Sequence, residues 1–222
     1  MPTPRDRRPA VVGWFAALAG ACALATLATF LVAIRTAEGQ RLDDSARGRL
    51  SPFDEPGAYS ATERLLDTIS VSSLALFGLG IMAVAIARGR PRLALGAGAL
   101  VLGANVPPPL LTAWLDRPDL VGDQLPEAGA FPSGHVTVAM SLAMGLALVV
   151  PPAVRWLAAV AGCAYASLVG VAVLALDWHR PSEAIGGYLV SVGWAAAVSA
   201  APPSLLPFPP LRSPLPPHPP PL

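Results

Sequence analysis

The sequence predicts an all-α, polytopic membrane protein with six transmembrane helices in a single bundle, and three observations support this. First, 54% of the 222 residues are hydrophobic and only 13% are charged, which lies outside the usual composition of water-soluble domains. Second, apolar runs of helical length follow one another with short connections between them. Third, arginines gather in alternate connections. The net charge of +1 gives no indication of a nucleic-acid partner.

The first apolar run, Val11–Ile34, follows a basic N-terminal segment of residues 1–10. Its length exceeds a typical signal-peptide core and no obvious small-residue cleavage site follows it, so we expect a retained first helix, with cleavage as the alternative.

The polar segment 35–67 mixes arginines with acidic residues and has turn signals at Ser51-Pro52 and Pro56-Gly57. We expect an extracytoplasmic loop here, with a short surface helix as the alternative.

Five further runs complete the expected bundle, which spans residues 11–201. Asn105 and the prolines at 107–109 predict that the third helix breaks near its outer end. Glycines such as Gly103 are expected to permit close helix packing. The segment 202–222 is rich in proline and has no apolar periodicity, so we expect a disordered cytoplasmic tail. The five runs are Ile69–Ala87, Leu93–Leu111, His135–Val150, Trp156–Leu176 and Ala184–Ala201.

The arginine distribution predicts that both termini are cytoplasmic. Six spans place both ends of the chain on one side, and the short connections assigned to that side are basic. All 15 basic residues are arginine and alanine is abundant, which indicates a GC-rich bacterial genome and hence a bacterial cytoplasmic membrane. The arginines assigned to the cytoplasm are Arg5, Arg7, Arg8, Arg88, Arg90, Arg92, Arg155 and Arg212.

Two histidine segments fall at the outer ends of these helices. One is Phe131-Pro-Ser-Gly-His135, and the other is Asp177-Trp-His-Arg-Pro-Ser-Glu183. Histidines at a membrane boundary suit acid–base or nucleophilic chemistry near neutral pH. Together with Arg117 in a third connection, they predict one extracytoplasmic site.

The same residues suit a phosphate group. The planar guanidinium of Arg117 can donate several hydrogen bonds to it, and the Ser133 hydroxyl and Gly134 amide stand at a predicted helix N-terminus, which favours an anion. There are also simpler interpretations. Ser133 is a good helix cap, Arg117 and Arg180 could anchor helix ends to head groups, and Trp178 fits an aromatic belt. Asp116 and Asp119 could pair with Arg117.

With these motifs the sequence resembles the type 2 phosphatidic acid phosphatase superfamily, whose core is shared with vanadium haloperoxidases. That family has a lysine followed after six residues by Arg-Pro, then Pro-Ser-Gly-His, then Ser-Arg with a histidine six residues past the arginine and an aspartate four residues further. Here the second motif is intact. Arg117-Pro118 matches the end of the first motif, but Leu110 stands at the lysine position. His179 and Glu183 match the end of the third motif, with Glu for Asp, and Ala172-Val173 replaces Ser-Arg.

The resemblance implies a role for each matching residue. His179 would attack phosphorus to form a phosphohistidine, Glu183 would orient its imidazole, and His135 would protonate the leaving oxygen. Arg117, Ser133 and Gly134 would bind the phosphate, and our hypothesis is that Arg180 partly replaces the missing arginine. No metal or other cofactor is expected.

The sequence therefore predicts a lipid phosphate or pyrophosphate phosphatase, with polyprenyl phosphates, phosphatidic acid and phosphatidylglycerol phosphate all open as substrates. The partners we expect are this lipid substrate and membrane lipids, with no nucleic acid, and the sequence leaves the oligomeric state undecided. Two alternatives stay open. An inactive family member could bind or move phospholipids, as the missing cations suggest, or the protein could be a cell-envelope scaffold that recruits partners through its tail. A soluble haloperoxidase activity does not suit a chain with six membrane spans.

Overall fold

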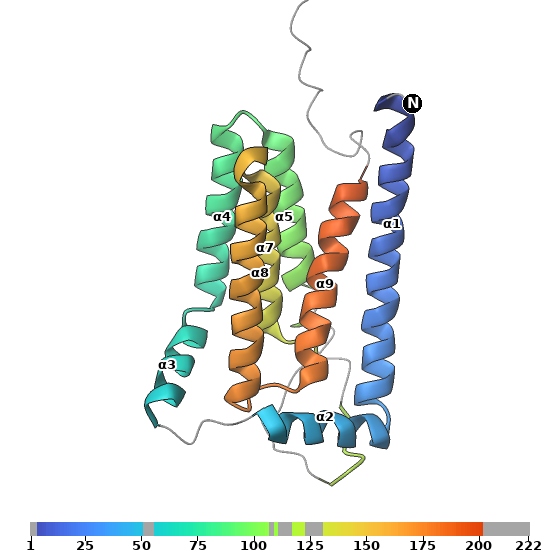
Figure 1. Ribbon diagram of the computed structural model, residues 1–222, viewed down its shortest axis with the longest axis vertical. Coiled ribbons are helices and arrows are strands. Elements are labelled where there is room, and N and C mark those ends of the chain that lie inside the picture. Colours follow the sequence, from blue (N-terminus) through green and yellow to red (C-terminus); the bar gives the residue numbers. More distant parts are fainter. Residues whose placement is uncertain (1–3, 51–55, 107–108, 111–116, 123–130, 202–222) are drawn as a thin grey trace, which may run out of the picture.

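The computed structural model describes residues 4–50, 56–106, 109–110, 117–122 and 131–201, and the regular structure within these ranges is helical. The predicted all-α class is confirmed for this part of the chain. Its main body is a bundle of long helices that stand side by side (Figure 1). These helices are α1 (Pro4–Thr29), α4 (Val71–Ala87), α5 (Pro91–Asn105), α7 (Gly134–Val149), α8 (Pro152–Ala175) and α9 (Pro181–Ala200).

Helix α7 lies at the centre and packs against α4, α5, α8 and α9, whereas α1 packs along α9 at one side of the bundle. One group of buried apolar residues, which includes Val136 and Val173, fills the space between α7, α8 and α9. A second, which includes Ile81 and Val149, lies between α4, α5 and α7. Gly103 of α5 faces the indole of Trp194, where a β-carbon would collide with the ring, so the expected packing role of this glycine is confirmed.

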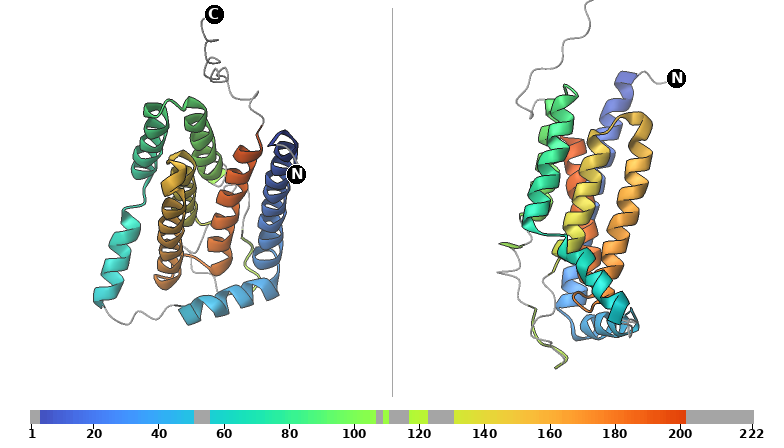
Figure 2. Two further views of the ribbon diagram at one scale, coloured as in Figure 1. Left: turned by 45° about the horizontal axis from the view of Figure 1, so that its top comes forward. Right: turned by 90° about the vertical axis from the view of Figure 1, so that its left-hand side faces the viewer.

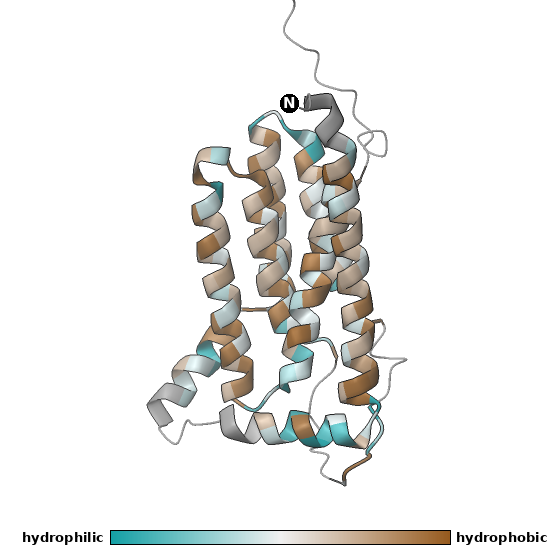
Figure 3. Cartoon of the chain, turned by 45° about the vertical axis from the view of Figure 1, so that its right-hand side comes forward, coloured by the Kyte–Doolittle hydropathy of each residue, from teal (hydrophilic) through white to brown (hydrophobic). Residues whose placement is uncertain are grey.

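The outer surface of the bundle is apolar, as a surface in contact with lipid must be. Figure 3 shows hydrophobic residues along the bundle helices. Hydrophilic residues are concentrated at the ends of the bundle and on α2 (Ala37–Leu50), the helix that lies across its lower end. The large apolar side chains exposed on this surface include Trp14, Leu24, Val71, Leu76, Leu79 and Trp156.

Two of the described helical segments are long and apolar enough to cross a membrane individually: Pro9–Ile34 with 26 residues and Pro152–Ala175 with 24. A third crossing is possible if Tyr59–Asp67 and Val71–Ala87, which are bent by 58°, form one broken span. Helices α4, α5 and α7 have 17, 15 and 16 residues. At about 1.5 Å per residue each is shorter than a hydrocarbon core of roughly 30 Å. The predicted number of six spans therefore stays a prediction.

The chain runs up and down through the bundle, so the ends of the helices form two groups (Figures 1 and 2). The start of α1, the end of α9, the turn between α4 and α5, and the turn between α7 and α8 lie at one end. The starts of α7 and α9 and the end of α8 lie at the other. The two histidine segments therefore share one end, opposite the basic turn that contains Arg88 and Arg90.

The polar segment 35–67 differs from the loop that we expected, because most of its described part is helical. After a π-helical turn, η1 (Phe30–Ile34), the chain forms α2 (Ala37–Leu50) and then α3 (Pro56–Asp67). Helix α2 lies across the lower end of the bundle (Figure 1). Its mean hydropathy is low, so apolar periodicity did not reveal it; buried polar contacts to the bundle hold it instead.

The helices end close to the predicted boundaries. Helix α5 ends at Asn105, which confirms the expected break in the third apolar run. The Asn105 amide donates to the Val101 carbonyl and to Ser141 Oγ of α7, each at 2.8 Å. Residues 107–108 and the proline-rich tail 202–222 lie outside the described part of the chain.

Candidate active site

The start of α9 brings His179 and Glu183 together through local helix-capping chemistry. Pro181 occupies the first helical turn and Arg180 is the N-cap residue, as suits a ring that fixes φ and lacks an amide proton. Oε2 of Glu183 accepts a hydrogen bond of 3.1 Å from the Arg180 amide. The same oxygen lies 2.8 Å from Nδ1 of His179. The Glu183 carboxylate therefore caps the start of α9 and also orients the His179 imidazole through Nδ1. Nε2 is the ring nitrogen of His179 that Glu183 does not contact.

The end of α8 fixes the backbone of His179 from the other side. Asp177 has a left-handed φ of 64°, and the amide of Trp178 donates to the Val173 carbonyl at 3.0 Å. With the bond from the Asp177 amide to Leu174, this is the Schellman ending of a helix. The His179 amide also donates to Val173, at 3.2 Å. Asp177 therefore lies directly after the end of α8.

The second histidine segment docks directly onto this turn. The Ser133 amide donates a hydrogen bond of 2.9 Å to the Glu183 carbonyl. Gly187 permits the close approach, because a β-carbon there would lie 3.0 Å from the Ser133 carbonyl oxygen. Ser133 is the N-cap of α7, yet its hydroxyl makes no capping bond. Ser133 Oγ is buried without a hydrogen-bond partner in the structure, so the simple capping interpretation of this serine is wrong. Gly134 is exposed at the first position of α7.

The two histidine rings lie close together in an edge-to-face arrangement. The ring centroids of His135 and His179 are 6.1 Å apart at an interplanar angle of 65°. Trp178 lies beside them, with its ring centroid 5.6 Å from that of His135. Trp178 also packs against the buried residues between α7, α8 and α9. Trp178 is half-buried and contacts both the core and His135, and its place in an aromatic belt stays a prediction.

Arg117 reaches the site from the connection after α5. Its Nη1 lies 3.7 Å from Oε1 of Glu183 and 3.9 Å from Oδ2 of Asp43, and its side chain is 11% exposed. Asp119, considered above as a partner for Arg117, instead accepts hydrogen bonds from the amides of Val121 and Gly122. Asp116 lies outside the described residues. Burial, and secondly the nearby Arg180 guanidinium, lower the pKa of Arg117.

Arg180 is buried in the same place, with only 2% of its surface exposed. Its Nε donates to Oδ1 of Asp44, and its Nη1 lies 3.9 Å from Oε1 of Glu183. Nη1 is buried without a hydrogen-bond partner, as is Oε1 of Glu183. The head-group anchor considered for Arg180 is wrong, because the side chain points inwards at the end of the bundle.

Apart from Glu183, which keeps a carboxylate, the positions at which this sequence departs from the family pattern bring no charge into the site. Leu110 is 63% exposed. Ala172 and Val173 belong to the buried apolar residues between α7, α8 and α9. Arg117 and Arg180 are the arginines that lie within 4 Å of Glu183, the carboxylate partner of His179, in the described part of the chain.

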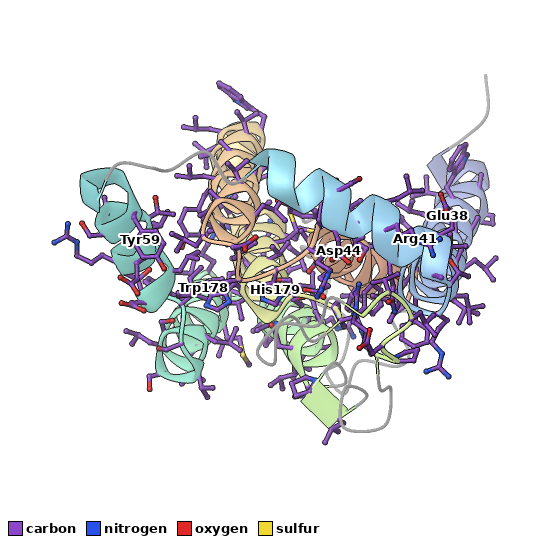
Figure 4. The ribbon with its side chains drawn as sticks, turned by 90° about the horizontal axis from the view of Figure 1, so that it is seen from below. Glu38, Arg41, Asp44, Tyr59, Trp178 and His179 are labelled. Atoms are coloured by element: carbon purple, nitrogen blue, oxygen red, sulfur yellow. The ribbon has the colours of Figure 1, made fainter. Side chains whose placement is uncertain are left out.

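Sequence reasoning missed the contribution of α2. Gln40 and Asp43 are 1% and 6% exposed, and Asp44 pairs with Arg180. Figure 4, seen from the α2 end, labels Asp44 and His179 near the middle of the view, with Glu38 and Arg41 further along α2. The spacing of Gln40, Asp43 and Asp44 places them on one helical face. The segment lacked an apolar stripe, so nothing in the sequence pointed to burial of that face.

A cavity of about 420 Å³ lies beside His135, between α4, α5 and α7. Its lining is largely apolar and includes Ile69, Leu74, Pro109, Val138 and His135. In the described parts of the chain, no group of three or more His, Cys, Asp or Glu side chains is arranged to hold a metal ion.

Comparison with known proteins agrees with this architecture. The sequence model of the PAP2 superfamily matches residues 65–205, which is more than half of the chain. A solved structure with a similar fold is described as a transmembrane PAP2 type phosphatidylglycerolphosphate phosphatase from Bacillus subtilis. It superposes with a TM-score of 0.62 at 19% sequence identity, covering 81% of this chain and 93% of that one. No curated protein sequence matches the chain significantly.

Proposed function

This chain belongs to the PAP2 superfamily, and from that membership we propose that it is a membrane-embedded phosphatase acting on a lipid phosphate or pyrophosphate. The observation that carries the proposal is the orientation of His179 by Glu183 at 2.8 Å, with the His135 ring 6.1 Å away. A nucleophile, a carboxylate that orients it and a separate acid–base group are what phosphoryl transfer through a covalent intermediate requires.

The proposed reaction has two steps. Nε2 of His179 attacks phosphorus, and as the N–P bond forms, the bond from phosphorus to the leaving oxygen breaks. His135 in its protonated form gives its proton to that oxygen, which leaves as an alcohol or a phosphate. A water molecule then attacks the phosphohistidine while His135 takes up its proton, and inorganic phosphate and free His179 are released. Glu183 stabilises the positive charge that develops on the His179 ring.

The phosphate oxygens are proposed to bind Arg117, Arg180, the Ser133 hydroxyl and the Gly134 amide. Arg180 Nη1 and Ser133 Oγ support this, since both are buried polar atoms without hydrogen-bond partners in the structure, and leaving such atoms unpaired is costly. A bound oxyanion would supply acceptors to both. Gly134 is exposed at the start of α7, where the helix dipole favours a negative charge.

We further propose that this site faces the extracytoplasmic side of a bacterial cytoplasmic membrane and that the six bundle helices all cross it. The position of the site at the opposite end of the bundle from the Arg88–Arg92 turn supports this orientation. The apolar cavity beside His135 supports a lipid substrate, because the part of the leaving group next to the reacting oxygen could lie there. Polyprenyl phosphates or pyrophosphates, phosphatidic acid and phosphatidylglycerol phosphate all fit this chemistry.

An inactive protein that binds or moves phospholipids is the second candidate. The absence of positive charge at Leu110, which is exposed, and at Val173, which is in the core, favours it. Each missing cation would remove a charge-assisted hydrogen bond to the phosphate. Such a protein would bind a lipid phosphate without releasing phosphate from it.

The test is phosphate release by the detergent-purified protein from a panel of lipid phosphates and pyrophosphates, with a metal chelator present throughout. We expect turnover in chelator, and we expect His179→Ala to lower it by roughly 10³-fold or more because the nucleophile is lost. His218→Ala is the matched control, because it removes the histidine of the tail. No release above the His179→Ala background for any lipid, from folded protein, would favour the lipid-binding candidate.

A further inference from the structure

Helix α2 presents three polar side chains to the site from a single face. Gln40, Asp43 and Asp44 are spaced at i, i+3 and i+4, so they lie next to one another on the helix surface. Gln40 and Asp43 are almost fully buried, whereas Glu38 and Arg41 of the same helix form an exposed ion pair, with 74% and 64% of their side-chain surfaces accessible. The buried face of α2 is therefore polar, and each of its three residues has a specific partner outside the helix.

Gln40 holds the segment that carries Arg117. Its Nε2 donates to the Pro118 carbonyl at 2.8 Å, and its Oε1 accepts from the Leu120 amide at 3.3 Å. The same Nε2 donates to the Ile34 carbonyl, also at 2.8 Å. A single amide side chain thus links the end of the first helix to the backbone directly after Arg117. Gln40 therefore restrains the backbone on the C-terminal side of Arg117.

Asp43 joins the same helix to the start of α9. Its Oδ1 accepts from the Ser182 amide at 2.9 Å, and its Oδ2 accepts from the Ser182 hydroxyl at 2.6 Å. Oδ2 also lies 3.9 Å from Nη1 of Arg117. Burial raises the pKa of the Asp43 carboxyl, although its hydrogen bonds from Ser182 act in the opposite direction.

Asp44 fixes the orientation of Arg180. It accepts a hydrogen bond from Nε, which is the inner nitrogen of the guanidinium group. The outer nitrogen Nη1 stays without a hydrogen-bond partner, buried 3.9 Å from Oε1 of Glu183. When Nε of an arginine is held, its remaining donors point in a fixed direction, which lowers the entropy lost when they bind an oxyanion.

We propose that α2 is a positioning clamp in which Gln40, Asp43 and Asp44 set the distance and direction of the Arg117 and Arg180 guanidinium groups for binding a phosphate group. This inference rests on the proposed function of the same site and adds residues that lie outside the histidine motifs. The clamp acts through the two arginines, so it governs affinity for the oxyanion rather than the chemistry at His179. The opposite possibility is that the α2 carboxylates occupy the place of the phosphate and must leave before it binds.

The experiment measures oxyanion binding separately from turnover. Orthovanadate is titrated into the full-length protein, and binding is followed by the fluorescence of Trp178, whose ring lies 5.6 Å from that of His135. Because the chain has five tryptophans, Trp178→Phe identifies the part of the signal that comes from this residue. The variants are Asp44→Ala, Asp44→Glu and the charge-matched control Glu38→Ala, which removes an exposed carboxylate from the same helix.

We expect Asp44→Ala to raise the dissociation constant of orthovanadate and the KM for the lipid phosphate at least tenfold, with kcat within about threefold of wild type. Asp44→Glu should restore much of the affinity because it keeps a carboxylate for Arg180, and Glu38→Ala should match wild type. Tighter binding or a lower KM in Asp44→Ala would overturn the clamp in favour of displaced carboxylates. Equal affinity in Asp44→Ala and wild type would also overturn it.

The two proposals fail in different ways. If the wild type binds orthovanadate but releases phosphate from no lipid, the proposed function fails. The orthovanadate affinities of wild type and Asp44→Ala still test the clamp in that case. If the wild type releases phosphate but Asp44→Ala has an unchanged KM, the clamp fails alone. If folded wild-type protein does not bind orthovanadate, the clamp is overturned because there is no oxyanion site to organise.

Should Asp44→Ala not fold, Gln40→Ala tests the clamp formed by α2 through Arg117, with the same expected rise in KM.

Discussion

The backbone amide of Ser133 donates a hydrogen bond of 2.9 Å to the carbonyl oxygen of Glu183. These residues are 50 positions apart in sequence, and each lies in the first turn or cap of a different helix. The bond sets the register of α7 against α9, so the position of His135 is tied to that of His179. A hydrogen bond between main-chain atoms therefore holds His135, the proposed acid–base group, relative to His179, the proposed nucleophile. Side-chain substitutions at either histidine would leave this bond in place.

His135→Ala should slow reactions according to the leaving group. For a lipid phosphate, whose alkoxide needs a proton as it leaves, we expect kcat/KM to fall by about 10²–10⁴-fold. For p-nitrophenyl phosphate, whose leaving group is stable without a proton, the fall should be tenfold or less. The measurement is kcat/KM for both substrates, since it reports the steps up to formation of the phosphohistidine. Equal losses on both would exclude His135 as the acid for the leaving oxygen.

Glu183→Gln should lower kcat by roughly 10²–10⁴-fold while the protein stays folded. The substitution keeps the size of the side chain but removes the negative charge that orients and stabilises the His179 ring. Glu183→Asp keeps the charge on a shorter stem, so its kcat should lie between those of wild type and Glu183→Gln. Steady-state kinetics with thermal unfolding as the control would check this order. A glutamine variant with wild-type kcat would contradict the orienting role.

Arg180→Ala should raise the KM for a lipid phosphate at least tenfold, because a buried guanidinium that can donate to the phosphate is lost. Arg180→Lys should recover little, since the three donors of an ammonium group all lie on one nitrogen and lack the planar fork with which a guanidinium reaches Asp44 and a phosphate at once. Arg41→Ala removes an exposed arginine of α2 and serves as the control. If turnover of the lipid phosphate by Arg180→Ala were unchanged, Arg180 would have no part in binding and the sequence hypothesis would be wrong.

Much of the fold could be predicted because apolar runs of helical length are a local signal. The apolar runs that end at Ala87, Val150 and Leu176 correspond to α4, α7 and α8, whose last residues lie within one position of these limits. The break after Asn105 followed from proline chemistry. At 35–67 the structure has the helices α2 and α3 where we expected a loop, with a short surface helix as the alternative. Polar contacts with distant residues stabilise α2 and leave no periodic apolar pattern in its sequence.

Parts of the site were equally local. The sequence His-Arg-Pro-Ser-Glu contains a helix start with proline at its first position and a carboxylate three residues after the cap, so the His179–Glu183 pair forms from neighbouring residues. The hydrogen bonds that Gln40 and Asp43 make with residues about 80 and 139 positions away could not be read in this way. The same holds for Trp178, whose place beside His135 depends on the turn at the end of α8.

The sequence by itself determined the helical class, the apolar character of the bundle, and the residue types available for phosphate chemistry, because each depends on composition or on contacts within one helical turn. Only the tertiary structure decided which charges meet. Arg180 turns inwards to Asp44, Asp119 binds its own turn instead of Arg117, and Ser133 Oγ stays buried without a partner. The physical reason is that electrostatic and hydrogen-bond energies depend on distances of a few ångströms between atoms. Here the packing of α2 against α9 and the Arg117 segment fixes those distances.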